Sequence, residues 1–218
     1  MPTLRVLAVD PLHPRDDRLG EAVAALRAGG VVAVPTETFY GLAVDAFAGP
    51  ALRRLNALKG KGPAAPILLL LADRPQAAQV ATDLPEPFEG LASRFWPGPL
   101  TLVVPAAADL PPEVGGGSAN VAVRVPGLAL PRRLAAALGR PISGVSANRT
   151  GERPCRTARE VAETFLDGLD LILDGGPTRG GAPSTILDLS VTPPRLLREG
   201  LLPLSALASF LGAGGLER

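Results

Sequence analysis

The sequence predicts an α/β fold in which one open, twisted mixed sheet is covered by helices. Short apolar runs rich in β-branched residues are mixed with segments of helical spacing, and the 25 glycines and 24 prolines mostly separate them, as loop residues do. No repeat of fixed period is visible, which argues against solenoids and propellers. No interdomain linker stands out, so we expect a single domain over residues 1–218, with its motif-bearing core at about 16–200.

Nine strands are expected from the apolar and β-branched runs. They lie at residues 4–9, 31–34, 67–71, 100–104, 121–125, 142–145, 169–173, 185–189 and 195–197. Pro35 ends the second strand, and the third, ILLLL, is apolar throughout, as is typical of a strand buried on both faces. A glycine-rich connection at residues 115–117 separates the fourth strand from the fifth.

Seven helices are expected from the spacing of leucines and from capping residues. They lie at residues 16–28, 50–58, 76–81, 87–95, 130–138, after Thr157, and at 204–211. Asp16 or Asp17 can cap the first helix, and Thr157 can cap the sixth. The stretches PTETFYGLAVDAF and SANRTGERP follow strands and are expected to begin as loops, because they are polar and contain glycine.

The composition argues against several classes of protein. The 22 basic and 21 acidic residues are nearly balanced, whereas proteins that coat nucleic acid or anionic membranes normally carry a basic excess. One cysteine, Cys155, excludes an internal disulfide, and together with the single His13 it makes a Cys/His zinc site implausible. The densest apolar run, residues 67–72, is too short for a membrane span, and the first residues lack a signal-peptide pattern, so a cytoplasmic protein is expected. Cys155 is expected to be a small buried side chain.

The small number of lysines is the one unusual feature of the composition. Of 22 basic residues, only Lys59 and Lys61 are lysine, so a chain that otherwise uses arginine keeps two lysines two residues apart. One interpretation is a solvated helix end. The other is a site that requires a compact ammonium group rather than a planar guanidinium.

Four polar loops carry the residues that are best able to bind a ligand or take part in catalysis. They are Thr36–Gly41, Lys59–Lys61, Ser146–Arg149 and Gly175–Thr185. Hydroxyls, glycine amides and cations can together bind phosphate, although the same residues are ordinary in turns. No Walker A motif, dinucleotide-binding glycine motif or Ser/His/Asp triad is present. A carboxylate pair of Glu37 with Asp45 is conceivable, although their spacing does not require it.

Two arginines lie in predicted strands or at their ends. Arg124 stands among the valines of VAVRVP, where a charge must either face solvent or meet an anion. Arg198 follows the two leucines of the stretch PRLLREG. It too must either face solvent or meet an anion.

Taken together, several ordered motifs are similar to those of the YrdC family, the threonylcarbamoyl-AMP synthases. The matching stretches are VPTETFYGLAVDAF, ALKGKGPAAPILLLL, FWPGPLTLVVP, VAVRVPG, ISGVSANRTGE, ILDGGPTRGGAPSTILDLS and LLREG, within roughly residues 31–200. The resemblance implies an open twisted α/β sheet with a concave, positively lined cavity. The sequence resembles the single-domain members of this family, so we expect no long C-terminal domain.

The resemblance also implies a reaction and a set of binding residues. L-Threonine, bicarbonate or CO2, and ATP would give threonylcarbamoyl-AMP and pyrophosphate, and a second protein system would transfer the threonylcarbamoyl group to tRNA. It leaves open whether this chain itself binds tRNA. The residues implied for ATP are Lys59, Lys61, Asn120, Ser146, Asn148 and Arg198, and those for threonine are Thr36, Arg124 and Ser184. Mg2+ would bridge the phosphates, since no metal-ligating side chains are identified, and no general base can be named.

Some positions depart from the family pattern. Lys61 stands where the family prefers Arg, Ala64-Ala65 replaces polar or basic residues, and Leu68 replaces a His of some members. Asn120 replaces a Thr, and Glu199 replaces a Pro. These departures support an alternative, a divergent YrdC paralogue that binds nucleotide or RNA with weak or no synthase activity. An RNA-binding module that uses the same concave surface is a further alternative, which the balanced charge and sparse aromatic residues disfavour.

Overall fold

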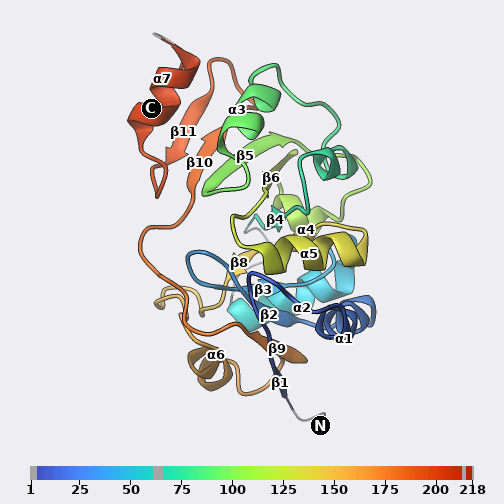
Figure 1. Ribbon diagram of the computed structural model, residues 1–218. Helices are drawn as coiled ribbons and strands as arrows, with labels where there is room; N and C mark the ends of the chain where they lie inside the picture. Colours follow the sequence, from blue (N-terminus) through green and yellow to red (C-terminus); the bar gives the residue numbers. More distant parts are fainter. Residues whose placement is uncertain (1–3, 61–65, 213–214, 218) are drawn as a thin grey trace.

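The strands form two open mixed sheets. The computed structural model describes residues 4–60, 66–212 and 215–217. The first sheet has the order β1 (Arg5–Ala8), β9 (Leu171–Asp174), β2 (Val32–Pro35), β3 (Tyr40–Ala43) and β8 (Val145–Ser146). The second has the order β11 (Arg195–Arg198), β10 (Thr185–Asp188), β5 (Leu100–Pro105), β6 (Asn120–Arg124), β4 (Leu68–Leu70) and β7 (Ile142–Ser143). In Figure 1 the first sheet occupies the lower half of the molecule and the second the upper half.

The expected α/β class with open mixed sheets is confirmed, but the strands are divided between two sheets where the sequence predicted one. Residues 142–145, expected as one strand, separate at Gly144 into β7 of the second sheet and β8 of the first. A Cβ atom at Gly144 would lie 2.4 Å from Leu70 Cγ, so the chain can change sheets here only without a side chain. This change of sheet carries Ser146 to the edge of the first sheet, beside β3.

The helices follow the sequence prediction closely, with two exceptions, and one strand lies where a loop was expected. They are α1 (Asp16–Arg27), α2 (Gly49–Lys59), α3 (Pro87–Phe95), α4 (Pro112–Gly115), α5 (Ala129–Leu138), α6 (Ala158–Thr164) and α7 (Leu204–Leu211). The helix predicted at 76–81 is a 3-10 helix, Pro75–Gln79, and α4 lies in a connection expected to be irregular. The strand β3 lies inside a stretch expected to begin as a loop, because its four buried residues pair with β2.

One hydrophobic core continues between the two sheets. The larger buried cluster contains residues of both sheets, among them Leu42 of β3 and Leu102 of β5. A smaller cluster packs α1 and α5 against the first sheet, with Leu26 and Leu134 among its members. This continuity supports our proposal that the motif-bearing core is a single domain.

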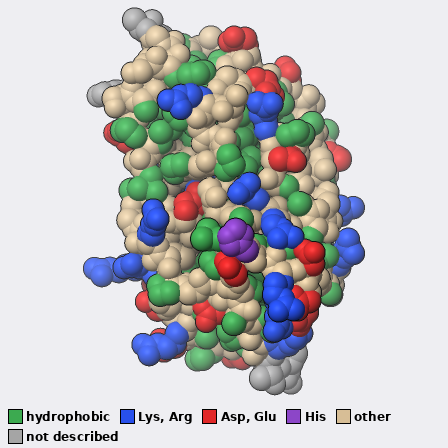
Figure 2. All heavy atoms as spheres, viewed as in Figure 1, with side chains coloured by type: hydrophobic (Ala, Val, Ile, Leu, Met, Phe, Trp, Pro, Cys, Tyr) green, Lys and Arg blue, Asp and Glu red, His purple; other side chains and the backbone are tan. Residues whose placement is uncertain are grey.

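Charged side chains of both signs are interspersed on the face that Figure 2 shows, with hydrophobic and uncharged surface between them. This distribution agrees with the nearly balanced charge of the sequence. Within the described residues, none of the helices combines the length and the apolar character that a membrane span requires.

Candidate functional site

A cavity of about 570 Å³ lies between the two sheets, lined by residues of β3 and β8 on one side and of β4, β5, β6, β10 and β11 on the other. Six of the eight predicted site residues that the structure describes line it: Thr36, Lys59, Arg124, Ser146, Ser184 and Arg198. Three of these are cations, and the described lining residues include no carboxylate. The cavity is therefore suited to anions.

The first group of site residues is the lysine cluster, which consists of Lys59, Ser146 and Asn148. Helix α2 ends at Lys59, whose carbonyl oxygen accepts hydrogen bonds from Thr150 N at 3.0 Å and Thr150 Oγ1 at 2.9 Å. These bonds fasten the loop after β8 to the helix end and satisfy a carbonyl that has no partner within the helix. The ordered helix end and the fastened loop bring the cluster together.

Lys59 is buried, with 3% of its surface exposed. Its Nζ donates to Ser146 O at 2.5 Å and to Asn148 Oδ1 at 2.9 Å. For Lys59, the interpretation as a solvated helix-end lysine is therefore wrong. Lys61 lies outside the described residues, as does Ala65.

Asn148 does not line the cavity and instead orients the other two members of the cluster. Its Oδ1 accepts from Ser146 Oγ at 2.6 Å as well as from Lys59, and its Nδ2 donates to Arg149 O at 2.8 Å and to Glu152 O at 2.9 Å. These four bonds fix the amide in one orientation. Asn148 thus holds the lysine from behind the cavity wall.

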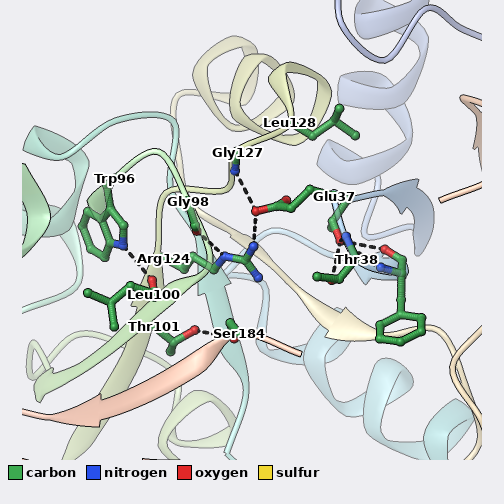
Figure 3. Close-up of polar contacts among 12 residues, drawn as sticks. Glu37, Thr38, Trp96, Gly98, Leu100, Thr101, Arg124, Gly127, Leu128 and Ser184 are labelled. Atoms are coloured by element: carbon green, nitrogen blue, oxygen red, sulfur yellow. Dashed lines mark hydrogen bonds and ion pairs between the residues drawn. The ribbon is translucent and has the colours of Figure 1, made fainter. Parts of the chain in front are cut away.

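The second group is the arginine cluster, which consists of Glu37, Arg124, Ser184 and Arg198. Arg124 ends β6 with only 4% of its side chain exposed, and its guanidinium points toward the carboxylate of Glu37 in Figure 3. Nε donates to Gly98 O at 2.9 Å, and Nη2 forms an ion pair with Glu37 Oε1. Burial lowers the pKa of Arg124, and the negative charge of Glu37 opposes that effect. The arginine meets an anion, which decides between the two interpretations of its sequence position.

Arg198 lies on β11 and is held by the backbone of Ser184. Its Nε and Nη2 donate to Ser184 O at 3.1 and 2.9 Å, and Nη2 also donates to Ser184 Oγ at 3.3 Å. The Ser184 hydroxyl also shares a 2.9 Å hydrogen bond with Thr101 Oγ1, on the same cavity wall. Burial and the neighbouring charge of Arg124 lower the pKa of Arg198. Arg124 is paired with Glu37, whereas Arg198 bonds only to neutral oxygens of Ser184, so net positive charge remains on this wall.

Thr36 lines the cavity, but its hydroxyl proton is used within its own turn. Oγ1 donates to Phe39 O at 2.7 Å and accepts from Thr38 N at 3.2 Å. The hydroxyl thereby closes the turn from which Glu37 projects toward Arg124 (Figure 3). Any ligand contact of Thr36 would use the oxygen as an acceptor.

Two expectations, one about a carboxylate pair and one about an amide side chain, differ from what the structure shows. The conceived pair of Glu37 with Asp45 is wrong, because Glu37 pairs with Arg124 while Asp45 pairs with Arg140 at 3.3 Å. Asn120 does not line the cavity, and its Nδ2 donates to Ser190 Oγ at 2.9 Å. It begins β6 on the same face as Arg124, four residues away along the strand.

Sequence reasoning missed several lining residues. Thr38, Tyr40 and Thr101 line the cavity, and the predicted departure Leu68 lies on its wall. Thr38 and Tyr40 stand two and four residues from the predicted Thr36, so a turn that bends around the cavity was the available signal. Thr101 gives no signal, because it reads as an ordinary strand residue.

No group of three or more potential metal-ligating side chains occurs among the described residues. Cys155 is buried, as expected, and its Sγ lies 3.4 Å from Thr164 Oγ1. Burial raises the pKa of this thiol, and Cys155 does not line the cavity. The thiol is a packing group of the core.

Comparison with known proteins agrees with the motifs. The family model Sua5_yciO_yrdC, described as "Telomere recombination", matches residues 24–200. A threonylcarbamoyl-AMP synthase of Pyrococcus abyssi is 41% identical over 191 residues, which are 88% of this chain and 56% of the relative. One of Bacillus subtilis is 38% identical over 93% of this chain and 59% of the relative. The chain therefore spans somewhat more than half the length of these two relatives.

A shorter relative and two solved structures extend the comparison. The threonylcarbamoyl-AMP synthase of Chromohalobacter salexigens is 40% identical, and the match covers 79% of this chain and 93% of the relative. Pyrococcus abyssi Sua5 complexed with L-threonine superposes with a TM-score of 0.90 at 39% identity, over 95% of this chain and 61% of that one. Escherichia coli YciO, at 23% identity and a TM-score of 0.80 over 92% of this chain and 97% of that one, shares the fold. Because the family model matches most of the chain and the relatives match it at this level of identity, the chain belongs to the Sua5/YciO/YrdC family.

Proposed function

We propose that the chain is an L-threonylcarbamoyladenylate synthase, a nucleotidyltransferase that uses L-threonine, bicarbonate or CO2, and ATP. The observation that carries the proposal is the placement of two buried cations, Lys59 and Arg124, on the walls of one cavity. Relatives that bear this name, and the structural neighbour complexed with L-threonine, support the assignment. The alternative of a paralogue without synthase activity has no comparable support.

The substrates divide between Lys59 and Arg124, and Arg198 of the arginine cluster is assigned to ATP. The ATP phosphates would be bound by Lys59, Ser146 and Arg198, with Asn148 holding the lysine. The resemblance to the family adds Lys61 to this group. Arg124, Ser184 and Thr36 would bind threonine, with the guanidinium on its carboxylate. We leave Asn120 out of the ATP site, because its amide is engaged with Ser190 outside the cavity lining.

The chemistry requires two bond-forming steps. The threonine amine attacks the carbon of CO2 and loses a proton, which gives a carbamate. A carbamate oxygen then attacks the α-phosphorus of ATP, the bond from that phosphorus to the bridging oxygen breaks, and pyrophosphate leaves. Buried cations directed at the phosphates stabilise the charge that develops on the leaving group.

The described lining residues include no carboxylate or imidazole that could act as a general base. Alignment of the amine, CO2 and phosphate in one cavity would therefore supply much of the acceleration. The donor set of hydroxyls and cations does not form a magnesium site of its own, so Mg2+ would be held chiefly by the phosphates of ATP.

We further propose that the product is handed to a transferase that modifies tRNA in the cytoplasm. A mixed anhydride of a carbamate and AMP is reactive toward amines, so the reaction that consumes it must be a transfer of the threonylcarbamoyl group. The interspersed charges on the surface in Figure 2 give no support to tight RNA binding by this chain itself.

The test is a direct assay with ATP, bicarbonate and labelled threonine, followed by detection of threonylcarbamoyl-AMP and pyrophosphate. We expect both products in equal amounts and neither when threonine or bicarbonate is omitted. ATP binding without either product would favour the divergent paralogue. Tight RNA binding at moderate salt without product would favour the RNA-binding module.

A further inference from the structure

The carboxylate of Glu37 reaches Arg124 from outside the main cavity. Glu37 is not among the residues that line that cavity, whereas Arg124 is. Instead, Glu37 lines a second cavity of about 440 Å³, together with Gly127 and residues of the segment 175–179. The ion pair therefore lies in the partition between the two cavities, and Glu37 does not occupy the space where a substrate would bind.

Two of the three guanidinium nitrogens of Arg124 are held by the protein. Nε is bonded to Gly98 O and Nη2 to Glu37 Oε1, as Figure 3 shows. Nη1 has no hydrogen-bond partner among the described residues, and Arg124 lines the main cavity. Because the group is planar, fixing Nε and Nη2 fixes the direction of the remaining N–H bonds.

Glu37 is itself held in place. Its Oε1 accepts from Gly127 N at 2.9 Å in addition to Arg124, and the turn closed by Thr36 sets the direction of its backbone. Its Oε2 is buried without a hydrogen-bond partner. A carboxylate with one buried orphan oxygen is costly to maintain, so its placement calls for a reason beyond packing.

We infer that Glu37 is a positioning residue that orients the Arg124 guanidinium for the carboxylate of an α-amino acid and offsets its charge. The inference rests on the proposed function, because it deepens the assignment of Arg124 to threonine. Offsetting the charge of Arg124 makes its guanidinium less attractive to polyphosphate, while the fixed N–H bonds still meet a single carboxylate. Glu37 thus favours the threonine carboxylate over an ATP phosphate at Arg124.

The test compares Glu37→Gln and Glu37→Ala with the unchanged protein, measuring threonine and ATP affinity by calorimetry. Glu37→Ala should weaken threonine binding about tenfold or more, because the guanidinium loses its orienting partner. Glu37→Gln keeps an acceptor for Arg124 and Gly127, so it should restore most of that loss. Because it also removes the offsetting charge, inorganic pyrophosphate should compete with threonine in Glu37→Gln but not in the unchanged protein.

A matched control is the ion pair of Glu113 with Arg53, at 2.5 Å, in which Glu113 Oε2 is likewise buried without a partner. Neither residue lines the main cavity. Glu113→Ala should therefore leave threonine affinity within about twofold of the unchanged protein.

The outcomes separate the inference from the proposed function. If the unchanged protein binds threonine and both Glu37 variants bind it equally well, without pyrophosphate competition, the inference is overturned. If the unchanged protein binds no threonine at all, the proposed function fails instead. ATP affinity reports whether each variant is folded, and if Glu37→Ala does not fold, the competition result for Glu37→Gln decides.

Discussion

The lysine and arginine clusters each place a buried cation on the wall of the same cavity, but they satisfy it differently. Lys59 is held by two neutral oxygens, Ser146 O and Asn148 Oδ1. Arg124 is held by one neutral oxygen, Gly98 O, and by the carboxylate of Glu37. The oxygens of Ser146 and Asn148 direct the ammonium group of Lys59 without adding a charge of their own, whereas the carboxylate of Glu37 both orients Arg124 and offsets its charge.

This difference matches the two kinds of anion in the proposed reaction. A triphosphate carries several charges and binds in many orientations, so net positive charge in a poorly hydrated cavity contributes most to its affinity. A threonine carboxylate carries one charge, so a planar fork of fixed donors contributes more to its recognition. The comparison of the two clusters favours ATP at the lysine cluster, in agreement with the resemblance to the family.

The largest effect is expected for Lys59→Ala. Removal of the ammonium group should lower adenylate formation about 100-fold or more, as loss of a buried group that stabilises transition-state charge does in other enzymes. The melting temperature should change little, because the free energy spent on burying the ammonium group offsets the hydrogen bonds that the variant loses. Pyrophosphate release and thermal melts of the variant measure the two effects. Activity like that of the unchanged protein would remove Lys59 from the phosphate site.

The next effect is expected for Arg124→Leu. The threonine KM should rise about 10- to 100-fold, which corresponds to a charge-assisted contact of roughly 1.5–3 kcal/mol, while ATP affinity stays nearly constant. This change also leaves Glu37 buried without its partner, so Arg124→Lys serves as a second variant that retains a charge but loses the fork. Threonine affinity unchanged in calorimetry for both variants would show that Arg124 only supports the fold.

The elements that depend on local sequence could be predicted from it. Helices α3 and α7 occupy the residues expected, because proline at or near the start and leucine spacing are local signals. The Thr157 cap is also present, with its hydroxyl accepting a bond from Glu160 N. Lys59 stood out through composition alone, and the structure buries it beside the predicted Ser146.

What could not be predicted depends on contacts between distant residues. Glu37 and Arg124 are 87 residues apart, and the one partner considered for Glu37 from the sequence was Asp45, which the spacing did not require. The need for glycine where the chain changes sheets at residue 144 comes from the side chain of Leu70, on a strand far away in sequence. Asn120 lies outside the cavity lining and donates to Ser190, 70 residues later, which the sequence likewise did not indicate. The spacing of hydrophobic residues along the chain does not indicate which distant residues pair.

A smaller effect should follow from Asn148→Asp, which places a carboxylate where the amide oxygen of Asn148 accepts from Lys59 Nζ. A carboxylate in place of the amide would offset the lysine charge and lower ATP affinity by about three- to tenfold. Because the change also removes the bonds to Arg149 O and Glu152 O, Asn148→Ala is the control that loses them without adding charge. Calorimetry with ATP should show the aspartate variant weaker than the alanine variant. Equal affinities would contradict the importance of net charge at Lys59.

The smallest effect is expected for Gly127→Ala, which acts on the arginine side without touching the main cavity. A Cβ atom at Gly127 would lie 3.3 Å from Glu37 Oε1, close enough to displace the carboxylate by a few tenths of an ångström. Since Glu37 fixes one nitrogen of Arg124, threonine affinity should fall about two- to threefold while ATP affinity stays the same. The same change in a Glu37→Ala background should have no further effect, because the displaced group is then absent. A loss of threonine affinity that persists in that background would mean that the loop at Gly127 acts independently of Glu37, and that orientation through the carboxylate is not what distinguishes the two clusters.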